Sequence, residues 1–160
     1  MSTTPPPFAP RGDTAQVEQG LTLSPRFDED GLIPAIASDA DTGEVLMVAY
    51  MNAEALARTI ESREAWFYSR SRKKMWKKGE QSGHVLQLRQ LLVDCDQDCV
   101  WMRVKVAGDS AACHVGYRSC FYREVPLGPM TEPGPRALKQ THQHKLFDPQ
   151  AVYGQGTPKA

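Results

Sequence analysis

The fold is decided by the stretch LIPAIASDADTGEVLMVAY, residues 32–50. Two apolar runs in it, 32–38 and 44–50, flank the turn sequence Asp-Ala-Asp-Thr-Gly at 39–43. Apolar, β-rich runs separated by Asp and Gly are typical of two antiparallel strands joined by a tight turn. The sequence therefore predicts a β-hairpin at the start of the folded part.

A helix is predicted directly after this hairpin. Asn52 provides an N-cap, Glu54 lies in the first turn, and apolar side chains recur with helical spacing as far as Ile60. Because strands outnumber this single convincing helix and no βαβ alternation is evident, we predict an α+β fold with a mainly antiparallel, barrel-like sheet and one or two helices. The further predicted strands are 66–68, 85–93, 100–106 and 120–125.

Both ends of the chain differ in composition from its middle, with more Pro and Gly and less apolar periodicity. We predict a mobile tail over residues 1–24, one folded domain over 25–125, and a Pro/Gly-rich tail over 126–160. His142 and His144 in the second tail could bind a metal, but such a pair is more typical of solvated polar residues.

Composition bounds the function classes. The 160 residues carry a formal net charge of zero, so no overall field attracts nucleic acid or acidic lipid. The first ten residues lack the basic and apolar regions of a secretory signal, and no apolar run approaches the roughly 18 residues of a membrane span. We expect a cytoplasmic protein that binds neither nucleic acid nor membrane. In that reducing compartment its four cysteines would be free, catalytic or metal-bound.

The densest group of metal-binding residue types is the run Val-Asp-Cys-Asp-Gln-Asp-Cys at 93–99. If it stays extended, its three carboxylates share one face and its two thiols the other. Converging carboxylates suit magnesium; the alternative is a solvated acidic turn. An EF-hand is excluded because its sixth position, which needs Gly, is Cys99, and its twelfth, which needs Glu, is Lys105. The carboxylates are Asp94, Asp96 and Asp98.

The cysteines fit no Cys-x-x-Cys pattern, which excludes a zinc ribbon. Four thiolates would close a structural zinc site, whereas three would leave one position open for water. Spacing alone does not decide whether Cys99 is a ligand, and buried free thiols are an equal alternative. The four are Cys95, Cys99, Cys113 and Cys120.

A basic segment, residues 70–78, holds six cations in nine positions, with Trp76 among them. Such a run is most often a solvated face. With an aromatic residue it could bind single-stranded nucleic acid, although the chain is neutral and has no recognised nucleic-acid motif. The alternative is a clamp for a phosphorylated small molecule.

Several motifs follow one another in order along the folded part. They are GLIPAI at 31–36, MVAYMN at 47–52, SRSR at 69–72, WKKGE at 76–80 with Ser82-Gly83, DCDQD at 94–98, and Cys113-His114 followed by RSCFY at 118–122. Together they closely resemble the phosphoribosyl-AMP cyclohydrolase family of histidine biosynthesis. The resemblance covers about residues 28–124, and neither tail matches. His84 departs from it, because it stands where the motif has Asn.

The resemblance implies a hydrolase that works as an intertwined homodimer with zinc and magnesium. It would open the adenine ring of N1-(5-phosphoribosyl)-AMP at the N1–C6 bond with zinc-activated water, leaving an imidazole carboxamide ribonucleotide. By motif, zinc would be held by Cys113 and Cys120 of one subunit and Cys95 donated by the other, so Cys99 would not be a ligand. Magnesium would be held by Asp94, Asp96 and Asp98.

The resemblance leaves the proton-transfer and substrate-binding roles to the chemistry of the residues. We expect His114 to be the catalytic proton shuttle, because its ordinary pKa lies close to neutral pH; the alternative is a structural partner of the zinc site. The phosphorylated nucleotide would be bound by Arg70, Arg72, Lys74, Trp76 and Lys78.

Two rival functions differ in their signatures. A deaminase of the cytidine type would use similar chemistry, but its H-x-E and P-C-x-x-C signature is missing. A nucleic-acid-binding module with a structural zinc would need Cys99 as the fourth ligand and an affinity that falls steeply with salt. The number of thiolates on the metal therefore separates the enzyme from the structural module.

Overall fold

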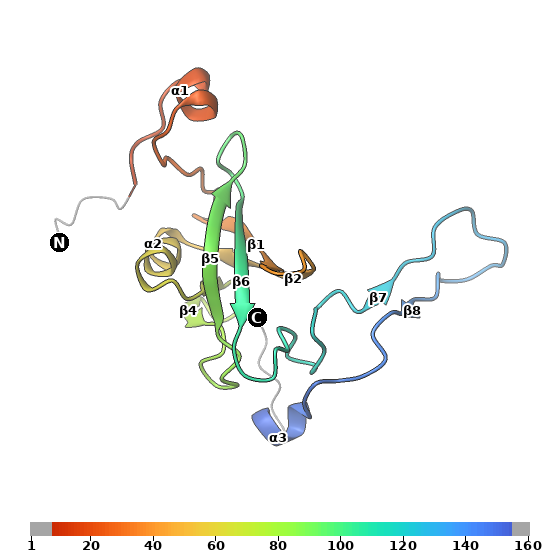
Figure 1. Cartoon of the computed structure of the whole chain (residues 1–160). Coiled ribbons are helices and arrows are strands. Elements are labelled where there is room, and N and C mark those ends of the chain that lie inside the picture. Colours follow the sequence, from red (N-terminus) through yellow and green to blue (C-terminus); the bar gives the residue numbers. More distant parts are fainter. Residues whose placement is uncertain (1–7, 155–160) are drawn as a thin grey trace.

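The computed structural model describes residues 8–154 and shows an α+β fold built on one mixed sheet (Figure 1). β1 pairs antiparallel with β2 and parallel with β6, which in turn pairs antiparallel with β5. The mainly antiparallel sheet is thus confirmed, with one parallel pairing that was not expected. The barrel-like closure is wrong for residues 8–154, where this sheet stays open. In sheet order the strands are β2 (Val45–Met51), β1 (Ile33–Asp39), β6 (Val100–Val106) and β5 (Leu86–Val93).

The predicted hairpin and helix are confirmed. In the β1–β2 turn, the carboxylate Oδ1 of Asp39 accepts the backbone N–H groups of Asp41 at 2.8 Å and Thr42 at 2.9 Å. Helix α2 (Ala53–Ser62) begins after Asn52, whose side-chain oxygen accepts the backbone N–H of Ala55 at 2.8 Å. These local bonds satisfy backbone donors that would otherwise lack partners, which fixes where the elements begin.

A second hairpin carries the basic segment. Strands β3 (Trp66–Ser69) and β4 (Lys74–Lys77) pair antiparallel; β4 was not predicted, because its sequence KMWK offers no apolar run. Phe67 is fully buried, and its ring lies 5.0 Å from that of Trp76. The backbone N–H of Lys78 donates to Ala65. The basic segment is therefore held against the core on two sides.

The core lies between the mixed sheet, α2 and the second hairpin. Apolar side chains from all three are fully buried, and each contributes about 1.5–3 kcal/mol relative to an exposed position. This packing makes a rigid platform from which the connecting loops project. Its largest members are Ile33, Leu46, Met51, Leu56, Phe67, Leu86 and Met102.

The described part of the chain contains three helices, one more than the upper expectation. The first, α1 (Thr14–Gln19), lies in the segment predicted as an N-terminal tail, where Asp13 and Gln16 form a capping box. Buried Gln97 holds this segment, accepting the backbone N–H of Ser24 at 2.9 Å and donating to the carbonyl of Val17 at 3.1 Å. No helix within residues 8–154 has the length and apolar character needed to cross a membrane.

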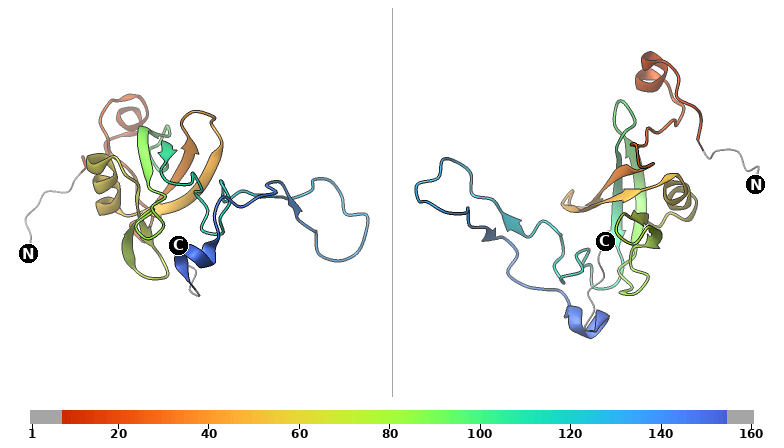
Figure 2. Two further views of the ribbon diagram at one scale, coloured as in Figure 1. Left: turned by 60° about the horizontal axis from the view of Figure 1, so that its bottom comes forward. Right: turned by 180° about the vertical axis from the view of Figure 1, so that it is seen from behind.

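The segment predicted as a C-terminal tail also has structure. The predicted strand at 120–125 is reduced to β7 (Arg123–Glu124), which pairs with β8 (Lys139–Gln140) at the base of a projecting arm (Figure 2). The chain then returns to the body of the molecule, where α3 (Pro149–Tyr153) is the last helix of the described residues. Mobility of either tail stays a prediction, and the outermost parts of both, 1–7 and 155–160, lie outside the described residues.

Candidate active site

The acidic turn, residues 94–99, connects β5 and β6. The extended form, on which the shared face of the carboxylates depended, is not present: Gln97 adopts the left-handed conformation, with φ of 55°, and the chain reverses in the turn that was the alternative. The cause is the Asp94 carboxylate, whose Oδ1 accepts the backbone N–H groups of Asp98 at 3.0 Å and Cys99 at 3.1 Å. These side-chain bonds replace a strand ladder with a local turn.

The turn brings three carboxylates together. One oxygen from each of Asp94, Asp96 and Asp98 lies within 4.8 Å of the other two. Sharing a hydrogen bond with Asp94 raises the pKa of Asp98, and the negative charges of Asp94 and Asp96 raise it further. Burial acts to raise the pKa of Asp94, but hydrogen bonds from Asp98 and from the Cys99 backbone lower it overall. Like charges at this separation favour a proton or a cation between them, and carboxylate oxygens fit magnesium.

The two thiols of the acidic turn differ from each other. Cys95 is exposed. Cys99 is half-buried, and its thiol points to the carbonyl of Val100 at 3.8 Å. Burial raises the pKa of Cys99, and the charges of Asp94 and Asp98 raise it further. The Cys99 thiol is therefore deprotonated less readily than an ordinary cysteine.

The thiol loop, residues 113–120, follows β6 and carries the other two cysteines. The backbone N–H of buried Cys113 donates to Tyr117 at 3.1 Å, which folds the loop back on itself. The backbone N–H of Cys120 donates to the carbonyl of Leu46 at 2.7 Å and ties the loop to β2. Both sulfurs are thereby brought to one side of the loop.

The surroundings of the thiol loop favour the thiolate form of Cys113. A hydrogen bond from Cys120 is the main cause that lowers the pKa of Cys113 to about 6; burial opposes this shift, and a backbone N–H and the ammonium of Lys78 assist it. The same bond raises the pKa of Cys120, which is the donor. Lys78 is only 7% exposed, and burial lowers its pKa while the two sulfurs raise it. A thiolate–thiol pair beside a buried cation fits a thiophilic metal such as zinc.

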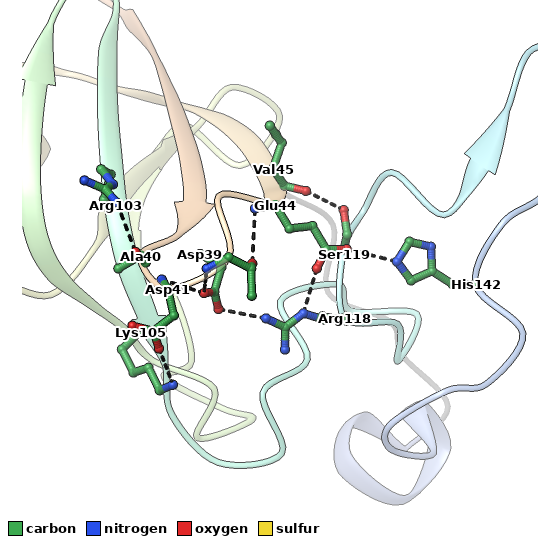
Figure 3. A network of polar contacts seen from close by, with 11 residues as sticks. Asp39, Ala40, Asp41, Glu44, Val45, Arg103, Lys105, Arg118, Ser119 and His142 are labelled. Atoms are coloured by element: carbon green, nitrogen blue, oxygen red, sulfur yellow. Dashed lines mark hydrogen bonds and ion pairs between the residues drawn. The ribbon is translucent and has the colours of Figure 1, made fainter.

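A clamp of charged groups fixes the thiol loop to the β1–β2 turn (Figure 3). The guanidinium of Arg118 donates to Glu44 at 2.7 Å and to Asp39 at 2.8 Å. Buried Ser119 donates to the carbonyl of Val45 at 2.7 Å. Burial acts to raise the pKa of Asp39, but backbone N–H groups and Arg118 hold it below its ordinary 3.8. The position of Cys120 is therefore set by tertiary contacts on the two preceding residues.

His114 lies half-buried beside Cys113. Burial lowers its pKa below 6.5, and the positive charge of Lys78 lowers it further. The imidazole is therefore neutral near pH 7 and able to accept a proton.

A pocket of about 370 Å³ opens beside the thiol loop. Its wall combines apolar side chains from β2, part of the basic segment, the loop 79–82, the thiol loop and one tyrosine from α3. A thiol, an imidazole, cations and aromatic rings thus face one cavity. The residues of chemical interest are Arg72, Trp76, Lys78, His114, Cys120 and Tyr153.

Two of the residues predicted to bind substrate lie elsewhere. The guanidinium of Arg70 lies 4.2 Å above the ring of Tyr50, and Lys74 is exposed on β4; neither lines the pocket. Sequence reasoning missed Val48 and Tyr153. No sequence signal marks Val48, whose 46% exposure on β2 only the structure shows. The Asp-Pro pair before Tyr153 is a helix-start signal and could have indicated the helix that carries Tyr153.

His84, the departure from the family motif, is buried in the described chain at 3% exposure. Its ring nitrogen lies 3.4 Å from a carboxylate oxygen of Asp109, and its ring lies 4.8 Å from that of Phe147. The loop before it needs Gly79, whose φ is +85° and where a Cβ would stand 2.4 Å from the backbone nitrogen of Val85. His84 therefore contacts the C-terminal segment.

The two candidate metal-binding regions lie at opposite ends of β6 (Figure 1). At about 3.3 Å per residue this strand alone separates them by roughly 20 Å. In the described residues only the carboxylates of the acidic turn meet as a group of three metal-binding side chains. Within one chain, Cys95 therefore does not reach the pair of thiols formed by Cys113 and Cys120.

Comparison with known proteins gives a consistent result. A family model described as phosphoribosyl-AMP cyclohydrolase matches residues 47–122. Three relatives carry that name. One from Rhodopseudomonas palustris (strain HaA2) is 53% identical, covering 86% of this chain and 90% of its own length. One from Sinorhizobium fredii is 50% identical, covering 92% of this chain and 94% of its own length. One from R. palustris (strain BisA53) is 49% identical over 153 residues, covering 96% and 99%.

The last relative corrects the expectation that neither tail matches. Its match covers 96% of this chain, so it extends beyond residues 28–124 into both predicted tails.

Proposed function

This chain belongs to the phosphoribosyl-AMP cyclohydrolase family, and from that premise we propose that it opens the adenine ring of N1-(5-phosphoribosyl)-AMP. As a member of this family it is a hydrolase of histidine biosynthesis. The bond broken would be N1–C6, and the product an imidazole carboxamide ribonucleotide. The observation that carries the proposal is the pocket beside the thiol loop, where His114, Cys120 and Lys78 meet. A cytoplasmic location stays a prediction from the sequence.

Zinc would be held by three thiolates, two of them from the thiol loop. The donor set fits, because the pKa of Cys113 is lowered to about 6 and the ammonium of Lys78 offsets the negative charge. The chemistry that zinc supplies when bound is a water of near-neutral pKa as nucleophile. Cys99 is left out of this set because it is half-buried with its thiol directed to the carbonyl of Val100, whereas Cys95 of the same turn is exposed.

The third thiolate would come from Cys95 of a second copy, so that the active form is a homodimer. Two observations support this. Cys95 is exposed on the turn at one end of β6, and no third thiol within residues 8–154 joins Cys113 and Cys120 at the other. In a two-fold dimer each copy would give its turn to the partner and receive one in return.

The same exchange would bring magnesium to the substrate. Asp94 and Asp96 flank Cys95 directly, so a turn that donates Cys95 carries its carboxylates to the partner's pocket. Magnesium held there would lie within reach of the phosphate or ribose oxygens of the nucleotide. One composite site would then use all three carboxylates and the Cys95 thiol of the DCDQD motif at 94–98 together with the two thiols of the thiol loop.

His114 would move the proton. Alkylation at N1 makes C6 an amidine-like, electrophilic carbon. Water adds its oxygen to C6, and the C6–N1 bond breaks as the C6=O bond forms; one proton of the water goes to N1 and the other to the exocyclic nitrogen, which becomes the amide NH2. A neutral imidazole accepts the proton from the water and returns it to N1. The lowered pKa of His114 keeps it in this accepting form at pH 7.

The nucleotide would be recognised by side chains that line the pocket. Arg72 is exposed at its edge, and its guanidinium lies 6.0 Å from the ring of Trp76. Such an arrangement suits a phosphate beside a base. Arg70 and Lys74 lie outside the lining and would act only through their charge.

An ultraviolet assay with purified N1-(5-phosphoribosyl)-AMP tests the proposal. We expect conversion to the imidazole carboxamide ribonucleotide that stops when a zinc chelator is added and returns with zinc. The Cys99→Ser variant is the matched control and should retain zinc and turnover. A folded, zinc-loaded protein without turnover would contradict the proposed reaction, and turnover insensitive to chelator would contradict the role of zinc.

A further inference from the structure

The C-terminal strap, residues 139–153, returns to the thiol loop and packs against it. The backbone N–H of Leu146 donates to the carbonyl of Gly116 at 2.7 Å. Gly116 has φ of +106°, and a Cβ there would lie 2.5 Å from the carbonyl oxygen of Phe147. Only glycine allows this close approach. The strap and the thiol loop are therefore fitted to each other at a single position.

Polar contacts hold the first half of the strap. A ring nitrogen of His142 lies 3.0 Å from the Glu44 carboxylate, the same carboxylate that Arg118 binds (Figure 3). The side-chain amide of Gln140 donates to the hydroxyl of Tyr117 at 2.7 Å. The strap thus shares the clamp that fixes the thiol loop.

A row of aromatic rings holds the second half. The ring of Phe147 lies 4.8 Å from that of buried His84 and 6.1 Å from that of Tyr153. Helix α3 between the two strap aromatics is capped by the side chain of Asp148, which accepts the backbone N–H of Gln150 at 3.0 Å. Edge and tilted contacts of this kind are favoured arrangements of aromatic rings. Through Phe147, these contacts connect Tyr153 to His84, which lies in the loop that follows the basic segment, and so orient the Tyr153 ring.

Tyr153 completes a wall suited to a flat ring. It lines the pocket together with Trp76, and the apolar side chains of Met47 and Val48 line it from β2. Aromatic and apolar surfaces around a cavity of about 370 Å³ fit a heteroaromatic base, while Arg72 at the edge fits its phosphate.

We propose that Tyr153 binds the purine ring of the nucleotide and determines its affinity, and that Phe147 is a positioning residue that sets Tyr153 in the pocket wall. The inference rests on the proposed function for the identity of the nucleotide. It adds a fifth segment of the chain to the site and gives the strap a role in substrate binding.

The test compares Tyr153→Ala with Val152→Ala, a truncation in the same helix at a residue that does not line the pocket. Base–aromatic contacts contribute about 1–3 kcal/mol, so Tyr153→Ala should raise KM and the Kd for AMP about tenfold or more. The value of kcat should change less than about twofold, because the contact is equal in ground and transition states. Tyr153→Phe should restore both constants, and Tyr153→Leu should not.

Phe147→Ala separates positioning from packing. It should reproduce the rise in KM, and the double variant with Tyr153→Ala should show no further rise, because both act through one ring. A KM and Kd for Tyr153→Ala equal to those of Val152→Ala would overturn the inference. Additive effects of the two substitutions in the double variant would overturn the positioning role of Phe147.

AMP binding, measured by calorimetry on the unmodified protein, keeps this test separate from the proposed reaction. If the protein binds AMP but turns over no substrate, the proposed reaction fails while the Kd comparison still decides the role of Tyr153. If it turns over substrate without measurable AMP binding, KM decides. A protein that does neither contradicts both.

Discussion

The acidic turn and the thiol loop lie at the two ends of β6, and the pKa of Cys99 in the first is shifted in the opposite direction to that of Cys113 in the second. In the acidic turn, burial and the charges of Asp94 and Asp98 raise the pKa of Cys99. In the thiol loop, a hydrogen bond from Cys120 and the charge of Lys78 lower the pKa of Cys113 to about 6. Deprotonation is thus disfavoured for Cys99 at one end and favoured for Cys113 at the other. The surroundings of a cysteine, more than its spacing, decide which metal chemistry it serves.

The largest effect should come from removing a ligand of the thiol loop. Cys113→Ser replaces the prepared thiolate with a hydroxyl, and we expect zinc content and turnover to fall by more than about 100-fold, since even partners that only support ligands contribute 10–100-fold. The measurement is metal analysis with steady-state kinetics. Cys99→Ser, the equivalent change in the acidic turn, should leave both unchanged; equal losses in the two variants would erase the distinction between the regions.

Loss of the Arg118 clamp should lower the folding stability without changing the magnesium affinity of the acidic turn. Arg118→Ala removes the ion-pair partner of the buried Asp39 carboxylate, which keeps its backbone N–H bonds, and we expect the free energy of unfolding to fall by about 1.5–3 kcal/mol. Denaturant unfolding with and without zinc measures it. The affinity of the acidic turn for magnesium should not change, because its bonds are local. A parallel loss of magnesium affinity would show that the two ends are coupled.

The same clamp has a pH signature. The folded pKa of Asp39 lies below its ordinary 3.8, so its contribution to stability is fully present above that value and is lost as pH falls through the folded pKa. In Arg118→Ala this contribution should shrink, so that the variant loses less stability than the parent below about pH 4. An unchanged acid limb of the unfolding curve would contradict this linkage.

A smaller effect is expected in the acidic turn. Asp96→Asn keeps the turn, because the backbone bonds are made by Asp94, but weakens the carboxylate site. We expect turnover to fall about 10–100-fold and to recover in part at high magnesium, with zinc content unchanged. Titrating activity with magnesium tests this. Loss of zinc in this variant would mean that the carboxylates support the thiol site directly.

The smallest effect concerns Lys78. Lys78→Met removes the buried ammonium, so the pKa of Cys113 should rise and zinc affinity at pH 7 should fall about tenfold. The deficit should disappear as pH rises above the pKa of Cys113, because the thiolate then forms without help. Folding stability should be equal or greater, since burying the ammonium is unfavourable. A pH-independent deficit would indicate lost packing instead.

Local signals predicted much of this fold. The hairpin around Asp39, the cap at Asn52 and the strands at each side of the acidic turn all follow from turn chemistry and periodicity, which act within a few residues. The motif residues of the site were identified by resemblance. The grouping of Lys78 with the thiols was not, because it depends on how the second hairpin packs.

Non-local contacts explain what was missed. The parallel pairing of β1 with β6 joins segments some sixty residues apart, and strand patterns do not encode partners. The sequence left open whether residues 94–98 are extended or form a turn, because alternation alone does not weigh the competing side-chain bonds of Asp94. Tyr153 was overlooked because Pro and Gly in the C-terminal segment suggested an irregular tail, although Asp148-Pro149 and Gly154 are start and stop signals of a helix.

Mixed dimers test most directly whether Cys95 of a second copy completes the zinc site, as we propose. Cys95→Ser and Cys113→Ser chains, each inactive alone, are refolded together in equal amounts. Half of the dimers should be mixed, and each mixed dimer has one complete site of two, so zinc content and turnover should recover to about a quarter of the parent value. Cys113→Ser mixed with Cys120→Ser should recover nothing, because both ligands come from one chain. Absence of recovery in the first mixture would contradict the shared site.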